Sequence, residues 1–246
     1  KIDAGKLELD TATFDLEEAI FDVMDMLSPL AAQKHIDMAF YYADNVPKHV
    51  VGDALRFKQI LTNLISNAIK FTPDGEIIVR ARMEQDDIGQ CLLHFSVQDS
   101  GIGLSGTDRK KLFESFSQGD ASVTRQFGGT GLGLAISKQL VHLMQGQIGF
   151  EDNQERAPTE KGSTFWFTAM FMVNEEDEYV EHPQFNDMQV VSYLAHPATA
   201  NILRHYLEDY AVEHIESSSI LDLFSHLNRL PQDVENTWLI VDHSGD

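Results

Sequence analysis

Apolar residues recur every three or four positions in three stretches of the chain, which predicts three amphipathic helices. We expect these helices over residues 14–34, 53–71 and 130–144, with Asp53 as the N-cap of the second. The apolar face of the first helix comprises Leu16, Ile20, Val23, Met24, Leu27 and Leu30. The apolar face of the second comprises Phe57, Ile60, Leu61, Leu64, Ile65 and Ala68.

Shorter apolar stretches between these helices predict strands over residues 36–43, 76–83, 91–99, 146–152 and 163–171. The turn sequences TPDG and DDIG flank the second of them. The strands 76–83 and 91–99 are expected to pair, and 146–152 is expected to form a hairpin with 163–171. Phe165 and Phe167 give the last strand one face in the core. Helices and mainly antiparallel strands alternate over residues 11–173, which predicts a two-layer α/β sandwich.

The pattern changes after the acidic sequence NEEDEYVEHPQ at residues 174–184, which reads as a solvated linker. Beyond it, a strand (188–195), a helix (199–210), a strand (211–217), a helix (220–230) and a strand (237–242) follow one another. This β-α-β-α-β order is the start of a parallel sheet. We therefore expect a domain over 11–173, a linker over 174–187 and a second, partial domain over 188–246.

Composition narrows the possible functions. The 246 residues are 43% hydrophobic and can bury a core. The net charge of −21 argues against nonspecific binding to nucleic acid or to anionic lipid. The chain has a single cysteine, Cys91, so no internal disulfide is possible. No run of eighteen apolar residues occurs, and we expect no membrane crossing by this segment.

Polar side chains form a line on the second predicted helix. Asn63, Asn67 and Lys70 stand at positions i, i+4 and i+7, on a different face from the core stripe. Amide oxygens can ligate a hard cation such as Mg²⁺, and the lysine can neutralise phosphate oxygens. Taken alone, the line is more typical of an ordinary polar helix face.

Two glycine-rich sequences could also contribute to binding a ligand. Asp99 ends a strand and is followed by SGIG, where glycines permit close backbone approach and the carboxylate could accept a hydrogen bond from an exocyclic amine. The sequence GGTGLGLAIS at 128–137 opens a helix and offers backbone N–H groups to an anion, with Arg125 just upstream. The spacing of GGTGLGLAIS fits neither a P-loop nor a dinucleotide fingerprint. Alone, these segments could also be a simple turn and a close-packed helix start.

Together the motifs carry a specific resemblance. The chain contains N-x-x-x-N-A-x-K-F, D-x-G-x-G, LFESFSQ, GGTGLGL and GSTFWF in this order. This set resembles the catalytic and ATP-binding domain of sensor histidine kinases, which have the Bergerat fold. The sequence around these motifs, above all FSQGDASVTRQFGGTGLGL, is similar to that of hybrid kinases of the BarA, GacS and VarS type. Residues 1–10 resemble the end of the dimerisation and histidine-phosphotransfer helix that precedes such a domain.

The resemblance implies Mg²⁺ and ATP as cofactors and assigns roles to individual positions. Asn67 resembles the Mg²⁺ ligand, with Asn63 assisting at the phosphates. Lys70 resembles the phosphate-binding lysine, Phe71 the ring beside adenine, and Asp99 the acceptor of the adenine amino group. The other implied nucleotide contacts are Gly101 and Gly103 at the pocket floor, Arg125 at the phosphates, Gly129, Thr130, Gly131, Leu132 and Gly133 through the backbone, and Thr164 near adenine.

The resemblance also implies a mobile lid over residues 117–128, anchored by Phe113 and Phe116. The acceptor histidine of this family stands in an H-E-x-R-T-P context, which none of the ten histidines has. We therefore expect it upstream of Lys1, so that this chain binds ATP without phosphorylating itself. Two alternatives stay open: an ATP hydrolase of the same fold, and a non-catalytic module whose partner docking is gated by ATP.

The second region resembles the first half of a response-regulator receiver domain. Asp242 stands where receivers carry the phospho-accepting aspartate. Receivers place an acidic pair after the first strand, whereas this chain has Ala195 and His196 there. We therefore expect a degenerate receiver.

The resemblance finally implies the setting of the whole protein. The parent would be a homodimeric inner-membrane sensor with this part in the cytoplasm. Its partners would be the dimerisation domain, receiver and histidine-phosphotransfer domains, and a cognate response regulator, without nucleic acid and without direct membrane contact by this part.

Overall fold

The computed structural model describes residues 8–103, 112–113, 132–153, 162–173, 184–195, 197–229 and 236–242. The chain divides into two compact units between Tyr179 and Val180, within the segment predicted as a linker. Of residues 1–10, only 8–10 are described, and these three are not helical.

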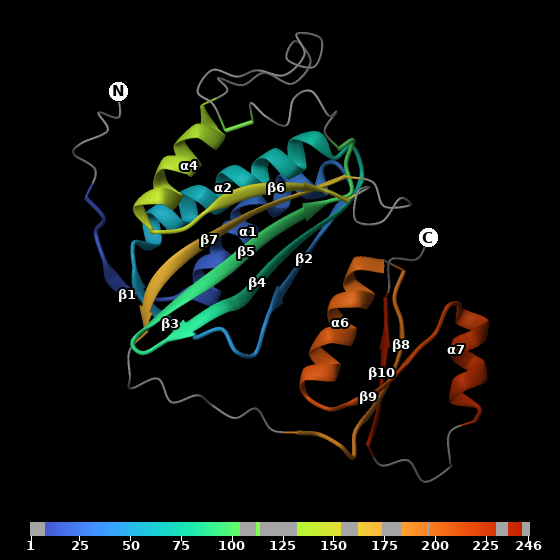
Figure 1. The fold of residues 1–246 in the computed structure, drawn as a ribbon. Helices are drawn as coiled ribbons and strands as arrows, with labels where there is room; N and C mark the ends of the chain where they lie inside the picture. Colours follow the sequence, from blue (N-terminus) through green and yellow to red (C-terminus); the bar gives the residue numbers. More distant parts are fainter. Residues whose placement is uncertain are drawn as a thin grey trace. The chain divides into compact units, whose positions relative to one another are not determined.

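The first unit is built on one seven-stranded sheet. Its order is β1-β3-β7-β5-β4-β2, with β6 paired to β7, and every neighbouring pair is antiparallel except β2 with β4. Figure 1 shows three helices together on one face of this sheet. The predicted two-layer α/β sandwich is confirmed. The strands are β1 (Ala12–Asp15), β2 (Ile36–Tyr42), β3 (His49–Gly52), β4 (Gly75–Asp87), β5 (Gln90–Asp99), β6 (Ile148–Asp152) and β7 (Ser163–Val173), and the helices are α1 (Leu16–Ala32), α2 (Ala54–Phe71) and α4 (Gly133–Leu143).

Side-chain caps set where the first two helices begin. Asp15 caps α1 by accepting a hydrogen bond from the Glu18 amide, and Asp53 caps α2 by accepting one from the Arg56 amide. Asp53 also accepts a hydrogen bond from the Asp10 amide at 3.0 Å, which ties the entering chain to the start of α2. The prediction of Asp53 as an N-cap is confirmed.

Two details of the predicted helices are wrong. Phe14 does not belong to the first helix, because it lies in β1 and pairs with Val50 of β3. Leu30 is 50% exposed, and Ala31 is the buried residue in the last turn of α1. The strands β1 and β3 were not predicted. The remaining apolar positions of both helices are buried as expected.

Aromatic packing joins α2 to the central strands. Phe57 is fully buried, and its ring lies 4.9 Å from that of Phe95 on β5 and 6.1 Å from those of Phe167 and Phe171 on β7. Burying one such ring stabilises the fold by about 1.5–3 kcal/mol. The helix that carries the polar line is therefore anchored to the strand that ends in Asp99.

The end of α2 is held by a lysine from the segment after α1. The Lys34 ammonium donates to the carbonyls of Ile69, Lys70 and Thr72, at 2.6, 3.1 and 3.2 Å. The last carbonyls of a helix have no partner within the helix, and a cation is favoured beside them. Lys34 thus fixes the segment that carries Lys70 and Phe71.

We predict that Lys34→Met lowers the free energy of unfolding of the first unit by about 1–3 kcal/mol, because buried carbonyls lose their partner. Urea unfolding measures the change, and Lys138→Met, at an exposed position on α4, is the matched control. Equal stability of the two variants would contradict the capping role.

The second unit has a three-stranded parallel sheet with the order β10-β8-β9. In chain order, helix α6 connects β8 to β9 and helix α7 connects β9 to β10, so the predicted β-α-β-α-β order is confirmed (Figure 1). The elements are β8 (Gln189–Tyr193), α6 (Pro197–Asp209), β9 (Glu213–Glu216), α7 (Ile220–Leu227) and β10 (Thr237–Val241).

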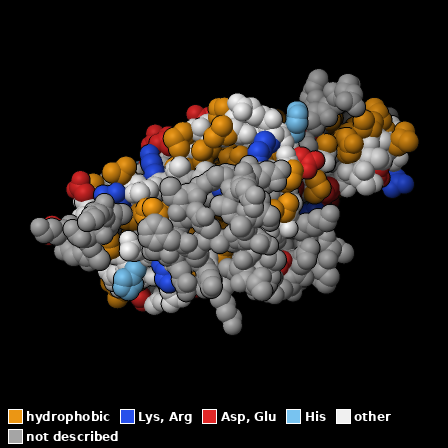
Figure 2. Space-filling model, turned by 90° about the horizontal axis from the view of Figure 1, so that it is seen from above, with side chains coloured by type: hydrophobic (Ala, Val, Ile, Leu, Met, Phe, Trp, Pro, Cys, Tyr) orange, Lys and Arg blue, Asp and Glu red, His pale blue; other side chains and the backbone are white. Residues whose placement is uncertain are grey.

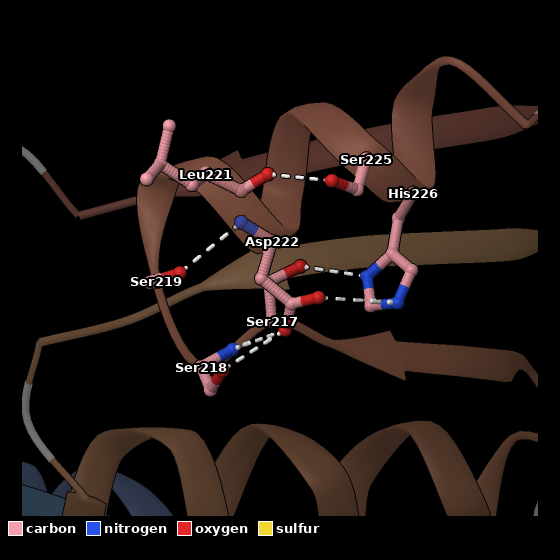
Figure 3. A network of polar contacts seen from close by, with 7 residues as sticks. All are labelled: Ser217, Ser218, Ser219, Leu221, Asp222, Ser225 and His226. Carbon is pink, nitrogen blue, oxygen red and sulfur yellow. Dashed lines mark hydrogen bonds and ion pairs between the residues drawn. The ribbon is translucent and has the colours of Figure 1, made fainter.

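A polar network fixes the start of α7 (Figure 3). The Ser219 hydroxyl accepts a hydrogen bond from the Asp222 amide, and the Asp222 carboxylate accepts from the Ser218 amide and hydroxyl, both at 3.0 Å. His226 lies on the other side of Asp222 and contacts the Ser217 hydroxyl at 3.1 Å. This reciprocal bonding is a helix-capping arrangement.

Charged side chains of both signs are mixed on the face shown in Figure 2, where they lie among hydrophobic ones. Within the described ranges, no helix combines the length and apolarity needed to cross a bilayer.

Candidate nucleotide-binding site

Asp99 is the most buried acidic side chain of the candidate site, with 2% of its surface exposed. It ends β5 opposite Ser163, the first residue of β7. One carboxylate oxygen accepts a hydrogen bond from the Gly101 amide at 2.9 Å, and the other accepts one from the Ser163 hydroxyl at 2.6 Å. Burial raises the pKa of Asp99, and these hydrogen bonds offset part of the rise. The carboxylate is therefore held in one orientation at the end of the central sheet.

Glycines allow three pieces of backbone to meet beside this carboxylate. A Cβ on Gly101 would lie 2.5 Å from the carbonyl oxygen of Phe71, so the chain after Asp99 passes directly against the end of α2. Gly162 has φ +95°, and a Cβ there would lie 1.9 Å from the Asp99 carbonyl oxygen. Gly103 has φ +68° and faces the Gly162 carbonyl. The two glycines predicted after Asp99 are thus required by close approach and by backbone conformation.

The polar line predicted on α2 is present, and its side chains are partly exposed. The Asn67 amide donates to the Asn63 side-chain oxygen at 3.5 Å, and Asn63 donates to the Ser137 hydroxyl at 2.9 Å. The Lys70 ammonium lies 4.9 Å from the centre of the Phe71 ring. Two amides and a cation therefore line one side of α2, as oxygen ligation of a cation and neutralisation of phosphate require.

The start of α4 lies against the same line. A Cβ on Gly133 would lie 2.3 Å from the Asn63 side-chain oxygen, so only glycine fits this contact without a shift. Leu132 precedes the helix and makes no side-chain cap bond. Phe113, predicted to anchor the lid, is partly buried against the core. Outside the described residues lie Phe116, the lid segment 117–128, Arg125, Gly129, Thr130 and Gly131.

Thr164 follows Ser163, the residue whose hydroxyl donates to the Asp99 carboxylate. Its hydroxyl donates to Asn153 at 2.8 Å, and the Asn153 amide donates to the Asp99 carbonyl at 3.1 Å. Ser163, not Thr164, bonds the carboxylate itself. A contact between Thr164 and adenine stays a prediction.

Sequence reasoning missed Ser163, Asn153 and Thr72. Ser163 could have been found, because pairing β5 with β7 places the first residue after Gly162 opposite Asp99. Asn153 carries no sequence signal, since it follows β6 and reaches Asp99 only in the fold.

The side chains of the candidate site include the groups that an adenine nucleotide with Mg²⁺ would need, namely the acceptor Asp99, the amides on α2 and the ammonium of Lys70. The Thr72 hydroxyl is fully buried and has no hydrogen-bond partner among the described residues. Atoms of Phe71, Thr72 and Asp99 pack closely around Gly101, so that a Cβ there would lie within 2.9 Å of each.

The fold and these motifs belong to a known class. Residues 52–171 match the family described as histidine kinase-, DNA gyrase B- and HSP90-like ATPase. This stretch contains α2, the end of β5 and α4. The chain therefore carries an ATP-binding domain of this ATPase family.

Its similar proteins are sensor histidine kinases. GacS of Pseudomonas protegens is 42% identical over 214 residues, which are 87% of this chain and 23% of that protein. BarA of Escherichia coli is 39% identical over 167 residues, 68% of this chain and 18% of that protein. The chain thus spans less than a quarter of either relative. The predicted resemblance to hybrid kinases of this type is confirmed.

Solved structures share the fold. Full-length ShkA in complex with AMPPNP superposes with a TM-score of 0.76 at 28% identity, over 96% of this chain and 45% of that chain. The nucleotide-free catalytic domain of the histidine kinase ThkA superposes with a TM-score of 0.51 at 26% identity, over 65% of this chain and 97% of that chain. The predicted histidine-kinase ATPase fold is confirmed.

We predict that Asp99→Asn is at least as stable as the parent chain at neutral pH, and that its advantage grows with pH. Because the folded state holds the Asp99 proton more tightly than the unfolded chain does, parent stability falls as pH rises from the ordinary Asp pKa near 4 through the raised folded pKa. Asparagine does not titrate, so this loss of stability is absent in the variant, and its side chain can still form hydrogen bonds with Gly101 and Ser163.

Thermal unfolding at pH 4.5 and 7.5 measures the difference, with Asp74→Asn at an exposed turn as the control. An Asp99→Asn variant that loses stability relative to the parent as pH rises would contradict the raised pKa.

Proposed function

We propose that the first unit binds one Mg²⁺–ATP and transfers the γ-phosphoryl group to a histidine on a dimerisation helix, as the kinase part of a hybrid sensor histidine kinase. The observation that carries this proposal is the buried Asp99 carboxylate, fixed by Ser163 and Gly101 against the end of the helix that bears Asn63, Asn67 and Lys70. The complex of ShkA with AMPPNP supports the choice of an adenine nucleotide.

Each side chain would have one task. Asp99 accepts a hydrogen bond from the adenine amino group, which orients the base. Asn67 ligates Mg²⁺, with Asn63 holding its amide, and Lys70 contacts the phosphates. Bound Mg²⁺ supplies neutralisation of the charge that develops on the phosphoryl group. Phosphoryl transfer asks mainly for positioning and charge neutralisation, and these residues offer both.

The outer residues complete this proposal. Arg125 would approach the phosphates from the lid. The backbone of residues 129–133 would surround the phosphates at the start of α4, and Thr164 would lie near the base. Gly133 supports this arrangement, since it brings the start of α4 to the Asn63 amide.

Rapid hydrolysis of ATP is not expected. ATPases of this fold place a glutamate one helical turn before the metal-binding Asn as a base for water, and this chain has Asn63 there. An amide does not accept a proton near neutral pH. The Asn63 amide also donates to Ser137, so it is committed to holding α4.

The acceptor is proposed to be a histidine outside the ten of this sequence, because none stands in the family's H-E-x-R-T-P context. The partners are then a dimerisation domain, receiver and histidine-phosphotransfer domains, and a response regulator. We further propose, on the family resemblance, that this chain belongs to the cytoplasmic part of a homodimeric inner-membrane sensor.

We predict that the chain labels a supplied dimerisation domain of a similar kinase from γ-³²P-ATP and retains no acid-labile phosphohistidine itself. Asn67→Ala should reduce transfer by at least about 100-fold, because Mg²⁺ is lost from the phosphates. Asn201→Ala on α6 is the control and should transfer normally. Transfer undiminished by Asn67→Ala, or phosphate retained on the chain alone, would refute the assignment.

We further propose that the second unit is a degenerate receiver. Asp242 follows β10, and its amide donates to the Tyr193 carbonyl at the end of β8. The positions after the first strand that receivers fill with acidic ligands are occupied here by Ala195 and His196. Without carboxylates there, Mg²⁺ has few anionic ligands beside Asp242.

We therefore predict that acetyl phosphate with Mg²⁺ leaves the full chain unphosphorylated at Asp242. Intact-mass spectrometry checks this, with an active receiver domain as the positive control. An added phosphoryl mass that disappears in Asp242→Asn would show an active receiver instead.

A further inference from the structure

Three polar side chains connect helix α4 to the proposed metal ligand on α2. Ser137 lies on α4 and is buried, with 2% of its surface exposed. The Asn63 side-chain amide donates to the Ser137 hydroxyl oxygen at 2.9 Å, and the Asn67 amide donates to the Asn63 side-chain oxygen at 3.5 Å. Asn67 is therefore linked to α4 through Asn63.

The contact with Ser137 sets the orientation of the Asn63 amide. A side-chain amide carries an acceptor oxygen at one end and two donor N–H groups at the other. The Asn63 nitrogen is directed to Ser137, so its oxygen is the atom that accepts from Asn67. Gly133 stands one helical turn before Ser137, and a Cβ there would lie 2.3 Å from this oxygen. Glycine thus leaves room on α4 for the amide in this orientation.

The orientation of Asn67 follows from that of Asn63. Because the Asn67 nitrogen donates to Asn63, its oxygen is the end of the amide that is left for a cation. Only this end can ligate Mg²⁺, since the nitrogen end presents N–H donors. Side chains behind a metal ligand fix its orientation, and their loss lowers the affinity for the metal.

We propose that Ser137 is a positioning residue for Mg²⁺, which holds the Asn63 amide so that Asn67 presents its oxygen to the metal. The inference rests on the proposed binding of Mg²⁺–ATP and adds a residue to which the sequence motifs assign no role. Since Ser137 is buried, it acts through Asn63 and not by contact with the nucleotide.

The variant Ser137→Ala removes the acceptor with little change of shape. Alanine is the best helix former, so α4 should persist in the variant. Affinity for AMPPNP in the presence of Mg²⁺ should fall roughly 10-fold, because the metal ligand is no longer held in one orientation. Affinity in EDTA should stay within about twofold of the parent value, because the metal-free nucleotide does not use the Asn67 oxygen.

The second unit offers a matched control. Ser192 on β8 is also buried, and its hydroxyl contacts the His214 ring nitrogen at 2.8 Å. Ser192→Ala makes the same chemical change in the other unit, so it should leave the affinity for AMPPNP unchanged both in Mg²⁺ and in EDTA.

Nuclear magnetic resonance of the nucleotide-free chain gives a measurement that does not depend on binding. The side-chain amide signals of Asn63 and Asn67 can be assigned from the variants that lack each residue. Ser137→Ala should move the signals of both asparagines, and Ser192→Ala should move neither. A change confined to Asn63 would overturn the proposed link to Asn67.

Calorimetric titrations of the full chain and both serine variants with AMPPNP, in Mg²⁺ and in EDTA, complete the test. The expected result is a loss of affinity for Ser137→Ala that occurs only in Mg²⁺. Equal losses in both media, which a merely structural role in α4 would produce, or no loss in either, would overturn the inference about Ser137. A parent chain that shows no Mg²⁺-dependent binding of AMPPNP would instead overturn the proposed function.

Discussion

The buried Asp99 carboxylate is the group on which the geometry of the site depends. Burying a charge is costly unless hydrogen bonds hold it, and here the Ser163 hydroxyl and the Gly101 amide do so. The first bond requires the register in which β5 ends opposite the start of β7. The second requires the chain to turn tightly against Phe71. Sheet register, glycine turn and helix end are therefore fixed together by one side chain.

One face of helix α2 packs in the core, and another carries the polar side chains of the candidate site. Phe57 and the other apolar residues bury one face against the sheet, and this packing holds the helix in place. The polar face carries Asn63 and Lys70, and Asn63 also meets the start of α4 at Gly133. Because the packed face fixes the helix, it also fixes the positions of the amides and the lysine on the polar face. Lys34 extends this preorganisation to the last turn.

Most helices and strands could be predicted from hydrophobic periodicity, because the apolar positions of a long amphipathic segment indicate which face is buried. The short strands β1 and β3 were missed, since four residues carry little pattern and Phe14 also fits the helical spacing. Asp15 caps α1 by accepting a hydrogen bond from the Glu18 amide, and this local signal would have set the helix start correctly.

The residues of the candidate nucleotide site could be predicted only where they lie in recognisable sequence motifs. Asp99 and the line on α2 were found in this way. Asn153 reaches Asp99 through a tertiary contact, which spacing along the chain does not encode.

The most direct test is a calorimetric titration of the 246-residue chain with AMPPNP, in Mg²⁺ and again in EDTA. If α2, the end of β5 and the start of α4 enclose one magnesium nucleotide, as proposed, the titration should find a single site per chain, with clearly weaker binding when the metal is removed. No detectable binding, or equal affinity for AMPPNP and its guanine counterpart with and without Mg²⁺, would contradict it.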